Sequence, residues 1–425
     1  MSEKIHSVRL DSDLCKGCTT CVKRCPTEAI RVRDNKATII SERCVDCGEC
    51  IRVCPVHAKK AVVDSLEVLK NYEYNIALPA PTLYGQFRNL TNRNYVLTAL
   101  KHIGFDDVFE VAVAAETISA ATYTELLSDR IPHPIISTAC PAVLRIISVR
   151  FPSLIRHLLD YQPPMELAAL WSKRRAMKKT GLPPGKIGCI FISPCPAKAT
   201  SVRSPLGSAH SSVDAVVSIA DVYPKLFSAM KDIDKPENLI QASAVGVGWA
   251  VSGGEGAASM EPNHLAASGV ENVIHILEAL EDDKLANVDL IELNCCGAGC
   301  VSGVLTIENP FIAKARLQTL MRHIGPALPT DGCPVDDMRW EEKIEYRPVL
   351  LLDADLGTAM VKMEQIRNLE KQFSGMDCGA CGAPSCRALA EDIVQGVSTE
   401  DQCVFVVREK LQQLLDDKSE TSPQE

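Results

Sequence analysis

The sequence predicts a multidomain protein of mixed α+β and α/β class, in which a central α/β domain lies between two small cysteine-rich domains. Three observations support this prediction. The chain has 425 residues, enough for two or three domains. Its cysteines form three groups, with eight in residues 1–70, seven in 71–345 and four beyond. Apolar runs alternate with amphipathic stretches in the middle group. The predicted domains are therefore 1–70, 71–345 and 346–415, followed by a disordered tail at 416–425.

Composition excludes several classes of function. The net charge of -9 argues against nucleic acid or an anionic membrane surface as the main partner. No apolar run reaches the roughly 18 residues of a membrane span, and the start MSEKIHSVRL lacks a signal-peptide core, so we expect a cytoplasmic protein. Because the cytoplasm keeps thiols reduced, the 19 cysteines indicate metal binding. Only Cys189 and Cys333 lie outside clusters, and we expect a buried core thiol and a loop thiol without function.

The first cysteine group contains one motif twice. The spacing C-x2-C-x2-C-x3-C-P occurs at Cys15–Pro26 and again at Cys44–Pro55. It is the signature of bacterial ferredoxins with two 4Fe-4S clusters, in which the fourth cysteine of each run binds the other cluster. A zinc site is the alternative, but zinc prefers two CxxC pairs without the CxxxCP tails. The rule assigns one cluster to Cys15, Cys18, Cys21 and Cys54, and the other to Cys44, Cys47, Cys50 and Cys25.

The middle segment is predicted to contain a parallel sheet. The apolar runs 186–193 and 288–294 read as buried strands, and 220–231 and 271–280 read as helices. Proline-rich and charged residues from 325 to 348 mark the end of this domain.

Three apolar runs of this segment end in cysteine, at Cys140, at Cys195 and at the Cys295–Cys300 loop. Sites in open parallel sheets lie beyond the carboxyl ends of the strands, so these cysteines can converge on one cofactor. Gly297 and Gly299 allow the backbone to approach it closely. The pattern indicates a buried iron-sulfur or related metal site; scattered core cysteines are the alternative.

At these residues the chain resembles the catalytic subunit of the iron-iron (FeFe) hydrogenases. That family carries the motifs TSCCPxW, PCxxKxxE and ACxxGCxxGG, with a ferredoxin domain upstream. The counterparts here are 137–143, 194–201 and 295–304, with weaker similarity at 80–82, 105–110 and 252–254.

The resemblance implies an H-cluster, a 4Fe-4S cube joined to a two-iron unit that bears carbon monoxide, cyanide and a bridging dithiolate. Its implied ligands are Cys140, Cys195, Cys296 and Cys300, with Cys300 linking the two parts. Cys295 replaces an alanine of the motif and is not expected to be a ligand. Lys198 matches a lysine that hydrogen-bonds a cyanide, although an ordinary surface lysine is the alternative. Pro81 and Thr82 match residues that line the other cyanide. The implied reaction is the reversible heterolytic cleavage of H2 into protons and electrons.

The chain departs from the family along the path that carries protons. Ala139 replaces a cysteine that transfers the proton in well-studied catalytic members, and Ser201 replaces the glutamate of PCxxKxxE. In the helix at 119–126, where the family reads IMEExxEL, this chain has Thr122 in place of an acid and keeps Glu125. A register shifted by one residue is the alternative, and it would leave Glu125 unmatched. Further changes occur at Val143, Ser193 and Asn294. Turnover is therefore expected to be slow, which favours the sensory type of FeFe hydrogenase that carries alanine at this position.

The last cysteine group, Cys378, Cys381, Cys386 and Cys403, has the spacing C-x2-C-x4-C with a distant fourth cysteine. It resembles the small, mainly helical 4Fe-4S domain of corrinoid iron-sulfur proteins. Gly379 and Gly382 are expected to free the backbone to wrap a cluster, and zinc is again the alternative.

Three functions are compatible with these features: a slow hydrogenase that senses H2 and signals through its clusters, a ferredoxin-linked catalytic subunit of a larger complex, or a hydrogenase-like iron-sulfur carrier without the two-iron unit. Expected partners are H2, protons, hydrogenase maturation factors and a redox protein, either a ferredoxin or a signalling protein. The sequence is also compatible with a homodimer. No GxGxxG follows a strand, so no flavin or nicotinamide site is predicted.

Overall fold

The computed structural model describes residues 6–128, 130–325, 335–349 and 351–420. It divides into two compact units. The first comprises residues 1–8, 45–48 and 61–347, and the second comprises 9–44, 49–60 and 348–425. The last cysteine group thus shares a unit with most of the first. No helix among the described residues is long and apolar enough to cross a membrane.

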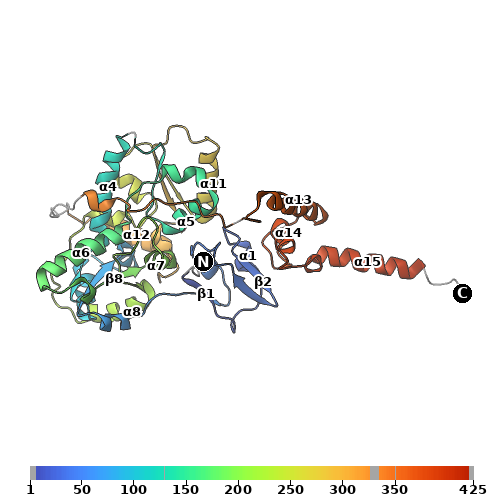
Figure 1. Ribbon diagram of the computed structural model, residues 1–425. Coiled ribbons are helices and arrows are strands. Elements are labelled where there is room, and N and C mark those ends of the chain that lie inside the picture. Colours follow the sequence, from blue (N-terminus) through green and yellow to red (C-terminus); the bar gives the residue numbers. More distant parts are fainter. Residues whose placement is uncertain (1–5, 129, 326–334, 350, 421–425) are drawn as a thin grey trace. The chain divides into compact units, whose positions relative to one another are not determined.

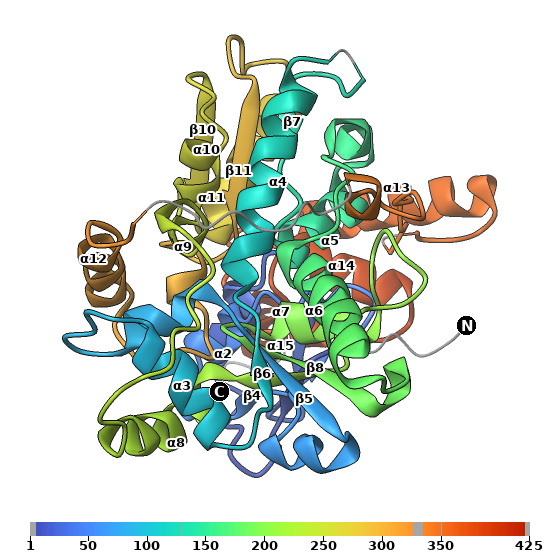
Figure 2. The same cartoon turned by 90° about the vertical axis from the view of Figure 1, so that its left-hand side faces the viewer.

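The first unit is built on two parallel sheets (Figure 2). One sheet has the order β6-β5-β8-β9 and the other β10-β11-β7. In register, Ile76 of β5 pairs with Cys189 of β8, and Ile291 of β11 pairs with Ile136 of β7. The prediction of parallel sheets is confirmed. The strands are β5 (Tyr74–Pro79), β6 (Asp107–Val108), β7 (Ile135–Ile136), β8 (Ile187–Ser193), β9 (Ala215–Ser218), β10 (His264–Ser268) and β11 (Leu290–Asn294).

Helices cover these sheets because the strands are apolar on both faces. All seven residues of β8 are buried, as a central parallel strand requires. Helix α6 packs on β5 and β8, and α11 packs on β10 and β11. The helices are α3 (Asn94–His102), α4 (Val111–Leu126), α5 (Pro141–Arg150), α6 (Pro164–Thr180), α7 (Pro196–Arg203), α8 (Ile219–Lys231), α9 (Ala244–Gly248), α10 (Gly254–Ala258), α11 (Val270–Glu281) and α12 (Pro310–Met321).

A buried ion pair joins three segments of this unit. Arg93 Nη1 donates to Glu110 Oε1 at 2.5 Å, and both side chains are 1% exposed. Glu110 also accepts from the hydroxyl of Tyr84, in the 3-10 helix η2 (Pro81–Gln86), at 2.7 Å, and from the backbone amide of Ala242 at 3.0 Å. Glu110 therefore anchors the short helix that begins with Pro81 and Thr82.

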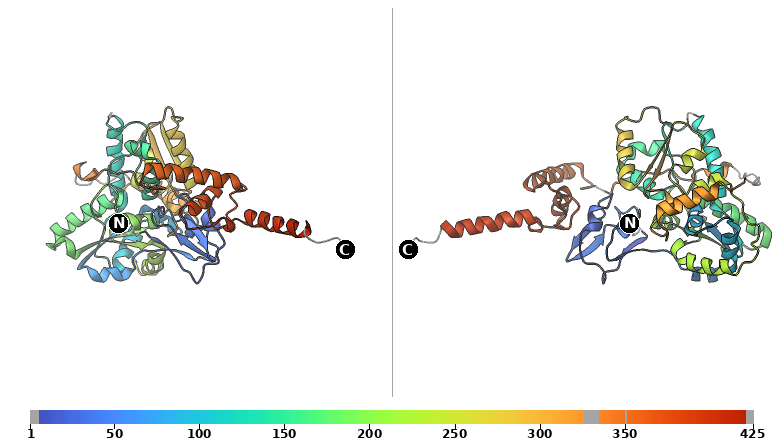
Figure 3. Two further views of the ribbon diagram at one scale, coloured as in Figure 1. Left: turned by 45° about the vertical axis from the view of Figure 1, so that its right-hand side comes forward. Right: turned by 180° about the vertical axis from the view of Figure 1, so that it is seen from behind.

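The second unit contains an antiparallel pair of strands, most of a further strand pair, two short helices and three longer C-terminal helices (Figure 1, Figure 3). Strands β2 (Ile30–Arg33) and β3 (Lys36–Ile39) pair antiparallel, and helices α1 (Thr20–Lys23) and α2 (Glu49–Arg52) lie within the two cysteine motifs. Helix α13 (Leu356–Gln372) packs on α14 (Cys386–Val394), and α15 (Val404–Glu420) follows. A further two-stranded sheet pairs β1 (Val8–Leu10) with β4 (Lys59–Ala61).

The C-terminal tail differs from its prediction, and one of the two isolated cysteines agrees with it. Helix α15 continues to Glu420, so the first five residues of the predicted disordered tail are helical, since 404–420 is rich in good helix formers; residues 421–425 lie outside the described residues. Cys189 is fully buried, with its sulfur beside the hydroxyl of Ser172 at 3.7 Å, which confirms a core thiol. Cys333 lies outside the described residues.

Candidate active site

Two of the candidate ligands sit where a parallel strand passes directly into a helix. Cys195 follows β8 and is the N-cap residue of α7, and Cys140 follows β7 and is the N-cap residue of α5. A proline is the first residue of each helix, where its fixed φ and missing N–H suit the first turn. Both sulfurs therefore lie at the carboxyl edge of a sheet.

The loop after β11 supplies the other two candidate ligands. Cys296 and Cys300 follow Asn294, the last residue of the strand. Gly299 has φ +82°, and a Cβ here would lie 2.4 Å from the backbone nitrogen of Ser252, so the chain needs glycine at this turn. Gly297 has open space around it, so only Gly299 makes a close approach to other backbone.

Lys198, on α7, is the common neighbour of these four cysteines. Its charge interacts with the sulfurs of Cys300, Cys195, Cys140 and Cys296, and these thiols raise the pKa of Lys198 against the opposing effect of burial. Its ammonium donates to the backbone carbonyl of Ala139 at 3.2 Å. The side chain lines a pocket rather than the outer surface, so the alternative of an ordinary surface lysine is wrong. The structure brings the five residues together; their role as ligands stays a prediction.

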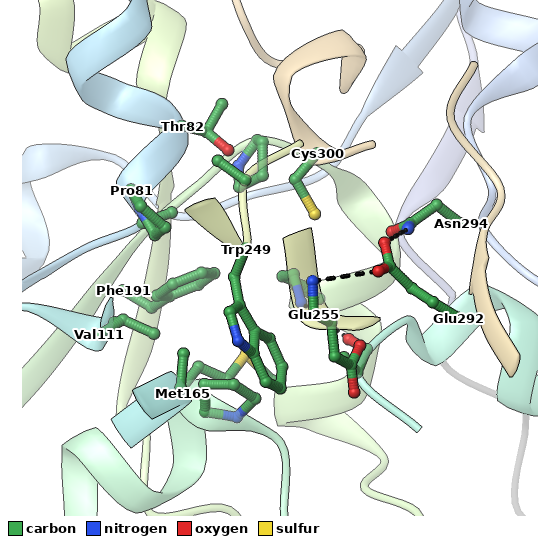
Figure 4. A pocket seen from close by; sticks show the side chains of 17 residues that line it. Pro81, Thr82, Val111, Met165, Phe191, Trp249, Glu255, Glu292, Asn294 and Cys300 are labelled. Atoms are coloured by element: carbon green, nitrogen blue, oxygen red, sulfur yellow. Dashed lines mark hydrogen bonds between the residues drawn. The ribbon is translucent and has the colours of Figure 1, made fainter. Parts of the chain in front are cut away.

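The pocket beside Cys300 is small, with a cavity volume of about 60 Å³ (Figure 4). Its walls are largely apolar, from Val111, Met165, Phe191 and Trp249. The polar groups that face it include Lys198, Thr82, Glu255, Glu292 and Asn294, and Ala139 also lines it.

This arrangement fits an H-cluster. Four thiols are the donor set that an iron-sulfur cube requires. The hydroxyl oxygen of Thr82 is buried and has no hydrogen-bond partner among the described residues, although a buried hydroxyl normally has one. The ammonium of Lys198 has three donor hydrogens and one hydrogen-bond acceptor among the described residues, the carbonyl of Ala139. Two donors and an apolar wall are suited to small ligands such as cyanide and carbon monoxide.

Two buried glutamates face the same pocket, and the sequence reasoning missed both. Glu292 Oε2 accepts the backbone amides of Glu255 and Gly256, each at 3.0 Å, and Oε1 accepts the side-chain amide of Asn294 at 2.8 Å. The backbone amide of Gly253 also donates to Oε1, at 2.9 Å, so four N–H groups fix the carboxyl group of Glu292 in place. The hydroxyl of Ser137 donates to Glu255 at 2.6 Å.

The environment of Glu255 favours its protonated form. Burial, together with the negative charge of Glu292, raises the pKa of Glu255 to about 8. Perturbed carboxyl groups in a pocket indicate a functional site. A signal was present in the sequence: Glu292 interrupts an apolar strand, and Glu255 follows the Ser252–Gly254 turn.

The predicted proton-path positions lie in different surroundings. Ala139 lines the pocket with a methyl group. Thr122 bonds to the carbonyl of Ile118 within α4, and Ser201 is buried in α7. Burial would raise the pKa of Glu125, but hydrogen bonds from Arg130, Ser128 and Tyr161 lower it to about 2. Glu125 is therefore present as a tightly paired carboxylate, and it is not among the residues that line the pocket.

Cys295 lies beside the pocket cysteines without joining the four around Lys198. It is 7% exposed, and a hydrogen bond from its thiol lowers the pKa of Cys140 to about 6. Cys47, a candidate ligand of a ferredoxin-type cluster, is also close enough to raise the pKa of Cys295. Within the first unit, Cys295 is thus near Cys140 and near Cys47, which are predicted ligands of two different clusters.

The second unit gathers two further sets of cysteines. Burial and the nearby sulfurs of Cys18, Cys54 and Cys15 raise the pKa of Cys21, so the first ferredoxin-type set is close together. Backbone amides point at sulfurs, as from Ala58 to Cys54 at 3.2 Å. Of the second set, Cys25, Cys44 and Cys50 belong to this unit and Cys47 to the first.

The C-terminal set is also gathered. Burial and the sulfurs of Cys378 and Cys403 raise the pKa of Cys381, and Cys386 packs in the same apolar cluster. Thiol side chains grouped in this way fit a 4Fe-4S cluster.

Three protein-family models match the chain. Residues 73–260 match the family described as "Iron only hydrogenase large subunit, C-terminal domain". Residues 7–55 match "4Fe-4S dicluster domain", and residues 375–405 match "Putative Fe-S cluster". The first match contains Cys140, Cys195 and Lys198 and ends before Cys296.

Curated relatives are hydrogenases of low sequence identity. The chain is 24% identical over 197 residues to Iron hydrogenase 1 of Clostridium pasteurianum, covering 42% of this chain and 34% of that protein. It is 27% identical over 215 residues to the Periplasmic [Fe] hydrogenase large subunit of Nitratidesulfovibrio vulgaris, covering 46% of this chain and 51% of that protein. The chain therefore spans between a third and a half of these relatives.

Among solved structures, a variant of [FeFe]-hydrogenase HydA1 from Chlamydomonas reinhardtii superposes with a TM-score of 0.48 at 15% identity, over 59% of this chain and 87% of that one. From the family-model matches and the curated relatives, the chain contains an iron-only hydrogenase large-subunit-like domain together with a 4Fe-4S dicluster domain.

Proposed function

We propose that the chain binds an H-cluster and cleaves H2 reversibly with low turnover, in a hydrogen-sensing or redox-signalling role. The observation that carries the proposal is the set of Cys140, Cys195, Cys296 and Cys300 around Lys198, next to a pocket in which position 139 bears only a methyl group. In the cell, the protein depends on hydrogenase maturation factors and exchanges electrons with a redox partner protein.

Each part of the pocket has a task in this function. When bound, an H-cluster supplies an open iron position that polarises H2 and a bridging amine that accepts a proton. The four cysteines would hold its iron, and Lys198 and Thr82 would hydrogen-bond its diatomic ligands. Phe191, Trp249 and Met165 exclude water, which strengthens these polar contacts. Glu255 holds a proton at the pocket wall.

Low turnover follows from the proton path. Ala139 has no exchangeable proton, and the ionisable groups that line the pocket with it are Lys198, Glu255, Glu292 and Cys300. A positioned acid or base typically contributes about 10²–10⁴-fold to a rate, so the loss of a thiol at position 139 is a large loss.

The test is Ala139→Cys in cofactor-loaded protein. We expect H2 oxidation to rise at least about tenfold, within the range of a restored acid-base group. Ala142→Cys is the matched control, since it adds a thiol three residues away in α5, outside the pocket lining. No gain in rate would mean that proton supply does not limit turnover. A wild-type rate equal to that of bulk hydrogenases would exclude the sensor role.

Two alternatives have specific support. A catalytic subunit of a larger complex is favoured by the likeness to the NADP-reducing hydrogenase subunit HndD of Solidesulfovibrio fructosivorans, at 22% identity, and predicts fast turnover. An iron-sulfur carrier is favoured by the end of the family match before Cys296. It predicts no carbonyl or cyanide stretches in the infrared spectrum of matured protein.

A further inference from the structure

Within the second unit, the C-terminal cysteine loop is hydrogen-bonded directly to the dicluster segment. The backbone amide of Val32, on β2, donates to the carbonyl of Gly382 at 2.8 Å. Strand β2 pairs with β3 on its other side, so this bond satisfies an edge that would otherwise be open. The loop that carries Cys381 thus completes the edge of β2.

Side chains of the dicluster segment bind the same loop. Lys23, on α1, donates to the carbonyl of Pro384 at 3.0 Å and to that of Asp377. Arg33 Nη1 donates to the carbonyl of Cys381 at 2.9 Å. These acceptors all lie in residues 377–384, between or beside the candidate cluster ligands. Lys23 itself lies midway between Cys21 and Cys25, which the ferredoxin rule assigns to different clusters.

Two glycines of the loop are required by this contact. Gly382 has φ +79°, and a Cβ there would lie 2.0 Å from the carbonyl oxygen of Val32. Gly379 has φ +76°, and its Cβ would lie 2.9 Å from Cδ of Lys23. They therefore do more than free the backbone to wrap a cluster: they let two cysteine-bearing segments touch.

Ion pairs hold the helix that follows the loop. Asp392, on α14, accepts from Arg31 and from Arg33, each at 2.7 Å, and is 5% exposed. Arg43 lies 3.6 Å from Glu391. Because α14 begins at Cys386, these pairs hold the helix and a candidate ligand together.

We propose that this contact is an electron-exchange interface, through which the C-terminal cluster and the ferredoxin-type clusters pass single electrons. It rests on the proposed function only in assigning 4Fe-4S clusters to these cysteines. In each step a reduced [4Fe-4S]1+ cluster becomes [4Fe-4S]2+, a neighbouring [4Fe-4S]2+ cluster becomes [4Fe-4S]1+, and no proton or bond is exchanged. An external ferredoxin-type carrier supplies or removes the electron at the C-terminal site, where Cys378 is exposed.

The charges at the interface support this role. A cube with four thiolate ligands is negatively charged, and reduction adds one more negative charge. The cations Lys23 and Arg33 touch the loop that holds the C-terminal cluster, so they stabilise its reduced form and raise its reduction potential. By linkage, reduction also strengthens the contact.

The test uses full-length, cluster-loaded protein reduced with dithionite and examined by electron paramagnetic resonance. We expect wild-type protein to show spin-spin broadening between the C-terminal cluster and its neighbours. Gly382→Ala should lose the C-terminal contribution while retaining its iron. Gly396→Ala is the matched control, because Gly396 has φ +75° in the same unit but nothing within 4 Å, and it should match wild type.

A second variant keeps the test decisive if Gly382→Ala fails to hold its cluster. Lys23→Met combined with Arg33→Met leaves the C-terminal cysteine loop intact and should lower the reduction potential of its cluster, with loss of the same broadening. Unchanged potential and broadening in this double variant, or no broadening in wild type, would overturn the interface. Absence of infrared carbonyl and cyanide stretches would reject the H2 chemistry alone and leave these spectra unaffected.

Discussion

The pocket site of the first unit and the C-terminal site of the second both gather four cysteines. The polar side chains at the first site face a cavity, whereas those at the second site bind the backbone. Around the pocket, Lys198, Glu255 and Thr82 face the space beside Cys300. At the C-terminal site, Lys23 and Arg33 bind the backbone carbonyls of the cysteine loop. Side chains that face a cavity can bind and protonate a small molecule. Side chains that bind backbone carbonyls instead fix the position of a cluster for electron transfer. Similar ligands therefore serve different tasks.

The largest expected effect concerns the ionic anchors of the two units. Glu110→Gln should lower the free energy of unfolding by about 3–5 kcal/mol, because it leaves Arg93 charged, buried and without its carboxylate partner. Asp392→Asn in the second unit should cost less, since Arg33 is 24% exposed there, and the buried Arg31 keeps the backbone carbonyls of Glu28 and Ile30 as acceptors. Chemical denaturation of both variants measures the difference. An equal cost would mean that the two units are anchored alike.

The second comparison removes one lysine from each site. Lys198→Met should reduce cofactor occupancy or activity about 10–100-fold, as for other residues that orient metal ligands, because it removes the cation shared by four thiolates. Lys23→Met should leave the iron content unchanged, because Lys23 binds carbonyl groups rather than sulfurs. Iron analysis and infrared spectroscopy measure both. Equal iron loss in the two variants would remove the distinction between the sites.

The smallest effect is a change in pH dependence. The pKa of Glu255 is about 8 in the folded protein, compared with an ordinary value of 4.5 that applies to the unfolded chain. Between these two pH values the folded protein therefore binds one more proton than the unfolded chain. The contribution of Glu255 to stability is present below pH about 4.5 and is lost as the pH rises to about 8. Glu255→Gln, which stays neutral, should therefore gain in Tm relative to wild type between pH 6 and pH 8.5. Thermal unfolding at both pH values checks this. Glu125→Gln is the control, because the pKa of Glu125 is lowered to about 2 and its charge does not change over this pH range.

Local patterns in the sequence predicted much of this molecule. The strands that end before Cys195 and Cys296, and the helices near 220–231 and 271–280, are visible as apolar runs and periodicity. The gathering of cysteines follows from the rule that parallel strands end at one edge of a sheet.

The remaining features depend on contacts between distant residues. The bond between Glu255 and Glu292 spans 37 positions, and that between Arg31 and Asp392 spans 361, so no local pattern specifies either. Gly382 shows the same limit: its backbone freedom was evident from the sequence, but its contact with Val32 was not. Glu125 is a further case. Its position in the helix was predicted from the sequence, but its ion pair with Arg130 was not.

The hydrogen bond from Lys198 to the carbonyl of Ala139 has a consequence for how such a site can change over time. A main-chain acceptor is supplied by every amino acid, so the lysine keeps its anchor whichever side chain occupies position 139. Chemistry at that position can therefore be exchanged by a single codon change without dismantling the framework around it. A lineage could pass between rapid and slow enzymes by that route while the metal-holding architecture stays as it is.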